Sequence, residues 1–309
     1  MTLPKVTVVG AGQVGATTAF LLLNKGIADV VMIDVAEGLP QGKALDMMHS
    51  RSVERFAPVV TGTNDYADTA GSDVVVVTAG LPRKPGMTRD DLLAANGAIV
   101  RSVIGAAVEA SPDAIVICVT NPLDVMTYLA WRVSGLPAER IFGMGGVLDS
   151  ARFAYAIAEE TGAGIDTITA LAVGAHGDAM VPLPRHSTVA GTPLTELLTP
   201  ERIGALVKRT IFGGAEVVAL LKTGSAFYAP AASVTAMVEA VLGDTGAVLP
   251  SCVHLDGEYG ISGVYMSIPA SLGRQGVRGV VEIDLDDVEL AALQASADTV
   301  AEAVSALGL

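Results

Sequence analysis

The sequence has few cysteines, few charges and no long apolar run. Its 309 residues include two cysteines, Cys118 and Cys252, and no CxxC motif or Cys/His cluster, which argues against a disulfide framework and against any bound metal. Charged residues make up 17% of the chain, against about 25% in ordinary soluble proteins, whereas hydrophobic residues make up 51%. Disordered chains need the opposite balance, so we expect one compact chain with two buried, free thiols.

Basic residues are also scarce: 19 Lys and Arg stand against 33 Asp and Glu, for a net charge of −14. A nucleic-acid binder or a protein that docks on an anionic membrane needs a basic surface, so the sequence predicts neither partner. No apolar run approaches the roughly 18 residues of a membrane-spanning helix. The N-terminus enters a strand pattern within a few residues and lacks the features of a signal peptide, so we expect a cytoplasmic protein.

The first half alternates short β-branched runs with helical patterns. Strands are predicted at 5–9, 29–33, 73–78, 114–119 and 141–143. Helices are predicted between them at 13–25, 38–50, 88–110 and 123–134. Strands that are apolar throughout are buried on both faces, which is typical of a parallel sheet covered by helices. The fold class is therefore α/β, with a doubly wound parallel sheet.

The second half has a different pattern. A helix is predicted at 148–160, a strand at 167–173, and short strands and turns at 263–285. We therefore predict two domains, a Rossmann-type domain at 1–143 and a mixed α+β domain at 144–309. At the C-terminus, apolar residues at spacings of three and four predict one helix with a buried stripe: Leu290, Leu293, Ala297, Val300, Val304 and Leu307.

A glycine motif follows the first predicted strand directly and opens the first predicted helix. It consists of Gly10, Ala11, Gly12, Gln13, Val14 and Gly15, and matches the dinucleotide pattern G-x-G-x-x-G. The glycines permit a tight turn, close approach to a pyrophosphate and close packing of helix on strand. Asp34 ends the second predicted strand, where a carboxylate accepts hydrogen bonds from ribose hydroxyls and repels a 2′-phosphate. The pattern predicts NAD rather than NADP, against the alternative of a glycine turn and a surface Asp.

Two other nucleotide-dependent classes do not fit. A phosphate-binding loop of the Walker type needs G-x-x-x-x-G-K-[ST], whereas the segment from Gly38 to Ala44 has the wrong spacing and lacks the hydroxyl. A short-chain dehydrogenase would carry Tyr-x-x-x-Lys, and no tyrosine has Lys four residues on.

Four further clusters are candidates for chemistry. His176 lies between glycines just after a predicted strand, where its ring could exchange a proton with a substrate, or simply cap a turn. Asp149 and Arg152 share one helix face, as an ordinary ion pair would. The basic loop at 80–91 suggests an anionic ligand, or a solvated loop. Asn121 also follows a strand, at the edge where ligands bind in such sheets.

Taken together, these segments resemble the lactate/malate dehydrogenase family, most closely its lactate-dehydrogenase-like malate dehydrogenase branch. The segments that carry the resemblance run in the family's order and cover essentially the whole chain. They are GAGQVG, the strand that ends at Asp34, AGLPRKPGMTRDDLLAAN, VTNPLDV, LDSARF and GAHGDAMVP.

The resemblance implies a role for each candidate. His176 is implied to accept the proton during alcohol oxidation, with Asp149 bonded to its other ring nitrogen. Arg152 is implied to grip the C1 carboxylate of the substrate as a bidentate fork, and Arg89 to polarise the C2 oxygen. Asn121 is implied to donate to that oxygen or to place the nicotinamide. The implied contacts of the cofactor, NAD, are Gly10, Ala11, Gly12, Gln13, Val14, Gly15, Asp34, Asn96, Val119, Thr120 and Asn121.

Arg83 indicates the substrate class. Residues 80–91 resemble the family's mobile loop, which closes over the substrate and brings in Arg83 and Arg89. Lactate enzymes typically have a neutral residue, often Gln, at the position of Arg83. A second cation there implies a small dicarboxylate, malate or oxaloacetate, because with pyruvate the buried charge would be unpaired. Two alternatives stay open: a dehydrogenase of lactate or another 2-hydroxy acid, and a catalytically silent NAD-binding protein.

The resemblance also bears on assembly and regulation. It implies a homodimer or a homotetramer. Sugar-phosphate-activated lactate enzymes carry a basic residue where this chain has Ala154, so we expect no such activation. Ser225 is a further candidate for lining the site.

Overall fold

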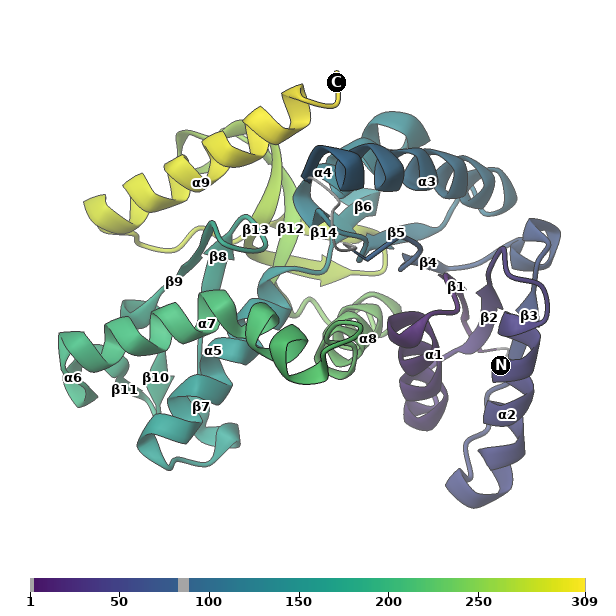
Figure 1. The fold of residues 1–309 in the computed structure, drawn as a ribbon, viewed down its shortest axis with the longest axis horizontal. Coiled ribbons are helices and arrows are strands. Elements are labelled where there is room, and N and C mark those ends of the chain that lie inside the picture. The colour runs from purple at the N-terminus through teal and green to yellow at the C-terminus, as the bar shows by residue number, and fades with distance from the viewer. Residues whose placement is uncertain (1–2, 83–88, 309) are drawn as a thin grey trace.

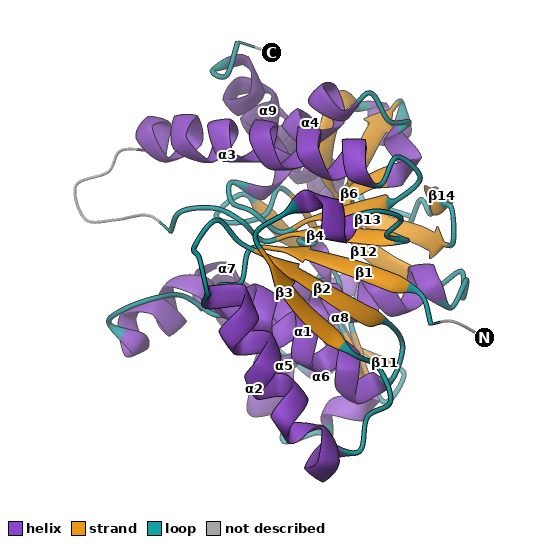
Figure 2. Cartoon of the chain, turned by 90° about the vertical axis from the view of Figure 1, so that its right-hand side faces the viewer, coloured by secondary structure: helices purple, strands orange, loops and turns teal. Residues whose placement is uncertain are grey.

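The computed structural model describes residues 3–82 and 89–308, with only the backbone of Arg89 and Asp90. One large sheet runs through the molecule between two layers of helices (Figure 1). Seen from the side, α3, α4 and α9 lie on one face of this sheet, whereas α1, α2, α5 and α8 lie on the other (Figure 2).

The first half forms six parallel strands in the order β3-β2-β1-β4-β5-β6. Its elements are β1 (Lys5–Val9), α1 (Gln13–Lys25), β2 (Asp29–Ile33), α2 (Leu39–Glu54), β3 (Val60–Thr63), β4 (Val74–Val77), α3 (Arg89–Ala110), β5 (Ile115–Cys118), α4 (Leu123–Ser134) and β6 (Ile141–Gly143). All four valines of β4 are buried, as a strand covered on both faces requires. The predicted doubly wound sheet is confirmed; only β3 lacked a prediction, and α2 continues past 50 to Glu54.

The second half adds antiparallel strands to the same sheet. Its elements are α5 (Gly146–Thr161), β7 (Ile168–Thr169), β8 (Ala172–Gly174), β9 (Met180–Pro182), β10 (Thr188–Val189), β11 (Thr192–Pro193), α6 (Leu194–Leu197), α7 (Pro200–Leu221), α8 (Tyr228–Leu242), β12 (Val248–Asp256), β13 (Ser262–Gly273), β14 (Gly276–Val280) and α9 (Asp287–Ser305). The sheet continues from β6 through β12, β13 and β8 to β9. The two predicted domains therefore share one continuous sheet.

The single strand predicted at 167–173 is wrong. The structure divides this segment into β7, which joins a small sheet with β10 and β11, and β8, which joins the large sheet. Between them the backbone bonds to side chains: the Leu171 N–H donates to Ser187 Oγ at 3.2 Å, and the Ala172 N–H donates to Ser150 Oγ at 2.9 Å. An apolar run has the same periodicity whether its residues belong to one sheet or to two. Periodicity alone therefore does not show where the chain passes from the small sheet to the large one.

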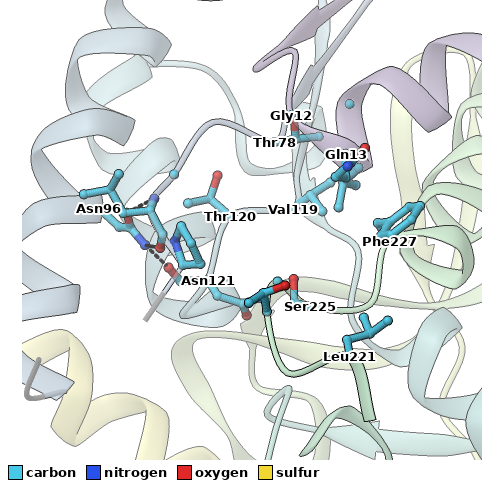
Figure 3. Close-up of a pocket in the computed structure, with 17 residues that line it drawn as sticks. Gly12, Gln13, Thr78, Asn96, Val119, Thr120, Asn121, Leu221, Ser225 and Phe227 are labelled. Atoms are coloured by element: carbon cyan, nitrogen blue, oxygen red, sulfur yellow. Dashed lines mark hydrogen bonds between the residues drawn. The ribbon is translucent and has the colours of Figure 1, made fainter. Parts of the chain in front are cut away.

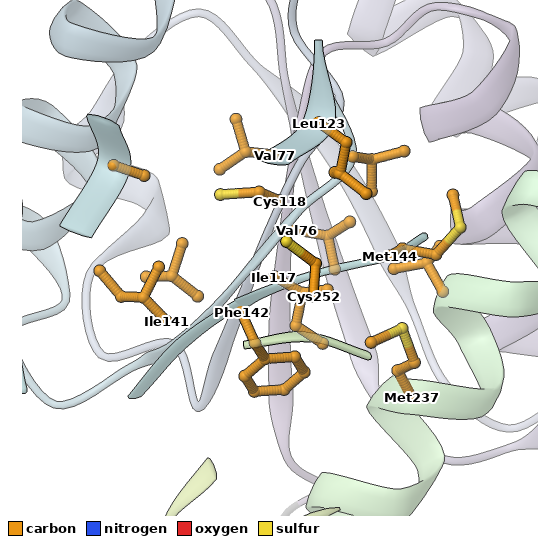
Figure 4. Close-up of a cluster of buried hydrophobic side chains, with 14 of the residues drawn as sticks. Val76, Val77, Ile117, Cys118, Leu123, Ile141, Phe142, Met144, Met237 and Cys252 are labelled. Atoms are coloured by element: carbon orange, nitrogen blue, oxygen red, sulfur yellow. The ribbon is translucent and has the colours of Figure 1, made fainter. Parts of the chain in front are cut away.

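The two halves meet in the core at Gly143, whose neighbours across the sheet are Cys118 on β5 and Cys252 on β12 (Figure 4). A Cβ on Gly143 would lie 2.6 Å from Thr127 Oγ1 and 3.1 Å from the Cβ of Cys252. Glycine is therefore the residue that lets α4 and β12 pack against β6 this closely. Both cysteines are buried and free, which confirms that prediction.

The predicted C-terminal helix is present as α9. Its stripe faces the core through Leu293, Ala297, Val300 and Val304, all of them buried. Asp286 caps its first turn by accepting from the Val288 and Glu289 N–H groups.

One helix bears on the prediction that no apolar run approaches the length of a membrane-spanning helix. By length and composition alone, the segment Asp91–Ala110 of α3 is apolar enough to cross a membrane. Of its most apolar window 33% is buried, and the segment packs against α4 on one face of the sheet (Figure 2).

Candidate active site

The glycine motif forms a tight loop at the carboxyl end of β1. Gly10 has a φ of +102°, and a Cβ there would lie 2.8 Å from both the Ala79 N and Thr78 Oγ1. A Cβ on Gly15 would overlap the carbonyl oxygen of Gly10. Around Gly12 there is open space, and no described side chain caps the N-terminus of α1. The loop therefore leaves free backbone N–H groups at a positive helix end, a setting that suits the pyrophosphate of a dinucleotide.

Asp34 is bound to this loop. Its Oδ2 accepts from the Ala11 N–H at 2.7 Å, and its Oδ1 accepts from the Ala36 N–H at 3.0 Å. From α2, Lys43 donates to the Ala11 carbonyl oxygen at 2.7 Å, so the peptide groups around Ala11 are held from both sides. Sequence reasoning considered Lys43 only as part of a failed phosphate-loop match; its position beside the glycine motif is a tertiary contact that no local pattern indicates.

Asn96 joins two loops at the wall of the cavity. Its Oδ1 accepts from the Leu81 N–H at 2.8 Å, and its Nδ2 donates to the Asn121 carbonyl oxygen at 2.7 Å (Figure 3). Thr120 donates to the Ala79 carbonyl oxygen at 2.7 Å. These bonds bring the segments after β4 and β5 together at the carboxyl edge of the sheet. Asn96 also lines the cavity at the glycine motif, so its contact along NAD stays a prediction.

Two neighbouring cavities follow this edge. One, of about 470 Å³, runs from the glycine motif to the α7–α8 loop at Phe227 (Figure 3). The other, of about 330 Å³, is lined by Arg152 and His176. Both are lined by Val14, Val119, Asn121 and Ser225. Because these residues are shared, the two cavities adjoin, and Asn121 lines both.

His176, Asp149 and Arg152 form one hydrogen-bonded group. Asp149 Oδ2 lies 2.8 Å from His176 Nδ1, and its Oδ1 accepts from Arg152 Nη1 at 3.1 Å. Asp149 is almost fully buried on α5, whereas the other two retain some exposure to the cavity. The structure therefore brings His176 to Asp149, 27 positions earlier in the sequence, and to Arg152 on the same helix, and it leaves the Nε2 of His176 free of the carboxylate.

The surroundings of His176 set its proton affinity. Burial alone would lower the pKa of His176, but the charge and hydrogen bond of Asp149 and the charge of Asp124 raise it above its usual value, against the charge of Arg152. A histidine whose imidazolium is stabilised in this way can donate a proton near neutral pH and take it back.

The helix α7 supplies a wall of the second cavity that sequence reasoning missed. Ile211, Gly214 and Val218 line it. A Cβ on Gly213 would lie 3.4 Å from Arg152 Cδ, and one on Gly214 would lie 3.4 Å from Arg152 Nη2. The Gly-Gly pair in the sequence was a possible signal, because two glycines inside a helix lower its stability unless something packs closely on them.

Two predicted substrate residues cannot be placed. Arg83 lies outside the described residues, and Arg89 begins α3 with its side chain also outside them. Among the side chains of 3–82 and 91–308, no three His, Cys, Asp or Glu residues gather as a metal site would require.

A dinucleotide cleft that opens onto a histidine held by a carboxylate defines a class, the nicotinamide-dependent dehydrogenases. Family models place the chain within it. The NAD binding domain of lactate/malate dehydrogenase matches residues 4–143, and the alpha/beta C-terminal domain matches residues 146–306. The chain belongs to the lactate/malate dehydrogenase family, which confirms the resemblance in its sequence, and it is an NAD-dependent oxidoreductase.

Individual relatives agree along the whole chain. A malate dehydrogenase of Roseiflexus sp. (strain RS-1) is 50% identical over 304 residues, 98% of each chain. The crystal structure of Cryptosporidium parvum malate dehydrogenase superposes with a TM-score of 0.97 at 43% identity, covering 99% of each chain. A lactate dehydrogenase from the same organism, solved with lactic acid and NAD, gives a TM-score of 0.96 at 42% identity, covering 100% of this chain and 99% of that one.

Proposed function

We propose that the chain is an NAD-dependent malate dehydrogenase, which interconverts (S)-malate and oxaloacetate. The observation that carries the proposal is the His176–Asp149 pair beside Arg152, on a cavity that adjoins the dinucleotide cavity. The Roseiflexus malate dehydrogenase, half of whose residues are identical, supports the same substrate. A silent NAD-binding protein is disfavoured, because the fold alone does not require this arrangement.

The geometry assigns each residue a task. When bound, NAD supplies the hydride acceptor. His176 Nδ1 bonds to Asp149, so the other ring nitrogen, Nε2, takes the hydroxyl proton of malate and returns it to oxaloacetate. Asp149 holds the ring and stabilises its charged form. Arg152 binds one carboxylate of the substrate as a planar fork.

The second carboxylate needs a second cation. Arg152 is the only arginine or lysine that lines this cavity in the described part of the chain. We assign the second cation to Arg83 and the polarisation of the C2 oxygen to Arg89, both from the loop at 80–91. The lactate dehydrogenase with a TM-score of 0.96 supports the view that a few side chains, rather than the fold, separate the two substrates.

The test of this function is malate oxidation by the purified chain. Initial rates of NAD reduction are compared for (S)-malate, (R)-malate and (S)-lactate, and initial rates of NADH oxidation for oxaloacetate and pyruvate. Both sets are repeated with Arg83→Gln. We expect turnover with (S)-malate alone, and an Arg83→Gln chain that loses oxaloacetate turnover by orders of magnitude while gaining relative pyruvate activity. A chain that prefers (S)-lactate would contradict the proposal.

We also propose a homodimer or homotetramer that works in the cytoplasm, in the malate–oxaloacetate step of the tricarboxylic acid cycle. Apolar side chains on the outside of α2 support an interface: Leu45 is 58% exposed and Val53, two turns on, is 77% exposed. Phe212 and Tyr228 on α7 and α8 are exposed as well. Light scattering on the purified chain tests this, with Val53→Glu expected to shift the mass towards a monomer. An unmodified chain that is monomeric at all concentrations would contradict it.

A further inference from the structure

The loop that carries His176 is held by side chains from helices far away in the sequence. The Ala175 N–H donates to Ser296 Oγ of α9 at 2.8 Å, and the same hydroxyl donates to the Ala179 carbonyl oxygen at 2.7 Å. The His176 N–H donates to Asp124 Oδ2 of α4 at 2.8 Å. The main chain of the loop is therefore fixed from two sides, separately from the bond between Asp149 and the ring.

Asp124 differs from Ser296 because it brings a buried charge. It is 5% exposed, and its second oxygen accepts from the Cys252 thiol at 3.4 Å. No lysine or arginine of the described chain lies within ion-pair distance of Asp124. Burial raises the pKa of the Asp124 carboxyl to about 6, although the charge and N–H of His176 oppose this, so it is mainly ionised above pH 7. Burial also raises the pKa of the Cys252 thiol, which stays a neutral donor.

We propose that Asp124 is a positioning residue for the proton transfer: its carboxylate fixes the main chain of His176, and its charge favours the protonated form of that ring. The proposal rests on the proposed function, in which His176 donates and accepts the proton. A buried carboxylate without a cation of its own stabilises any positive charge that appears beside it. The imidazole of His176 is the group that acquires that charge during the reaction. Asp149 bonds to the ring itself, whereas Asp124 bonds to the backbone N–H of the same residue.

Several other charged or titratable groups face Asp124 and His176, and the test must separate their effects from that of Asp124. They are Asp149 and Arg152 from α5, Cys252 from β12 and Cys118 from β5. The arginine opposes the protonated ring, and both thiols are neutral because burial raises the pKa of each.

The test is an NMR titration of the His176 ring in the chain without cofactor, labelled at its four histidines with ¹⁵N and assigned with His176→Asn. Asp124→Asn keeps the size and an oxygen for the His176 N–H but removes the charge. Ser296→Ala is the matched control, because it removes two anchors of the same loop without a change of charge. We expect Asp124→Asn to lower the midpoint by roughly half to one pH unit and Ser296→Ala to leave it unchanged.

The same shift must appear in the pH dependence of the reaction rate. In the reduction of oxaloacetate, which needs protonated His176, the fall of kcat at high pH moves to lower pH in Asp124→Asn, with the KM for NADH unchanged. An unchanged midpoint in Asp124→Asn, or an equal shift in Ser296→Ala, would overturn the proposal. If the unmodified chain shows no turnover, the proposed function fails alone, because the NMR shift is measured without substrate. If Asp124→Asn does not fold, the ¹³C shift of the Asp124 carboxyl in the unmodified chain decides, since a carboxyl that is protonated at pH 7.5 contradicts the proposal.

Discussion

The cofactor half forms its part of the site from one short segment, whereas the catalytic half forms its part from residues that are far apart in the sequence. In the cofactor half, six consecutive residues from Gly10 to Gly15 form the turn after β1 and the start of α1. In the catalytic half, His176 takes one partner 27 residues away, Asp149, and another 52 residues away, Asp124. The loop that carries His176 is anchored at Ser296, 121 residues from Ala175.

The difference follows from what each half must do. A phosphate group is bound by backbone N–H groups and a helix end, which a short segment supplies once glycine has removed the side chains. A proton is moved by side chains at fixed distances, and these come from separate elements. The continuous sheet that joins β6 to β12 is what brings those elements together.

The largest effect should come from the catalytic half. His176→Asn is expected to lower kcat by about 10³- to 10⁴-fold, because asparagine cannot take up and return the proton, while the Kd for NADH stays within about twofold. Stopped-flow rates and NADH fluorescence measure the two quantities. His186→Asn, at a histidine that lines neither cavity, is the control and should have normal rates. Near-normal turnover in His176→Asn would mean that another group moves the proton.

Arg152→Lys tests the substrate side of the same half. Lysine keeps the charge but loses the planar fork that Gly213 and Gly214 accommodate, so kcat/KM for oxaloacetate should fall by about 10²- to 10³-fold. Arg202→Lys, whose side chain pairs with Glu160 at the surface of α7, serves as the control. Equal losses in both variants would contradict the assignment.

Asp34→Ser tests how the cofactor half selects NADH over NADPH. Removing the carboxylate ends its repulsion of a 2′-phosphate, so the preference for NADH over NADPH should fall by about 10- to 10²-fold, with little change in saturated kcat. Parallel titrations of the two cofactors measure this. Asp298→Ser, at an exposed position on α9, should keep the original preference. A preference that survives in Asp34→Ser would mean that other groups select the cofactor.

Gly10→Ala tests whether the glycine at this turn also contributes to the free energy of unfolding. The strained φ and the contacts of the added Cβ with Ala79 and Thr78 should lower the free energy of unfolding by about 2–4 kcal/mol. Gly26→Ala is a matched control, since Gly26 has a φ of +70° but open space around its Cβ, so about 1 kcal/mol is expected. Denaturant melts compare the two, and equal losses would show that the close contacts at Gly10 contribute nothing.

The smallest effect is a shift in pH dependence. Because Asp149 and Asp124 outweigh burial and raise the pKa of His176, the midpoint of its titration should lie above the ordinary 6.5. The reduction of oxaloacetate needs the protonated ring, so its rate should fall as pH rises through that midpoint, whereas malate oxidation should rise. Rates across pH 5 to 9 in both directions test this. A midpoint below 6.5 would mean that burial dominates.

The sequence predicts the two halves unequally well. Local patterns predict the strands at 5–9 and 29–33, the glycine motif and the helix at 123–134. Each depends on neighbouring residues alone, because runs of valine favour strands and glycines permit tight turns. The bond between His176 and Asp149 came only with the resemblance, and no spacing predicts it. Lys43, Asp124 and Ser296 were missed because each acts on a backbone group that is brought near by tertiary packing. The split of 167–173 was missed for a similar reason, since the second sheet is assembled from distant segments.

The most direct test is the ratio of kcat/KM for oxaloacetate to that for pyruvate, measured from NADH absorbance on the same purified chain. We expect fast NADH oxidation with oxaloacetate, a ratio of at least about 10³, and little activity when NADPH replaces NADH. A ratio below one would keep the fold and His176 but contradict a malate dehydrogenase. No oxidation with either substrate would contradict the proposed chemistry of the catalytic half.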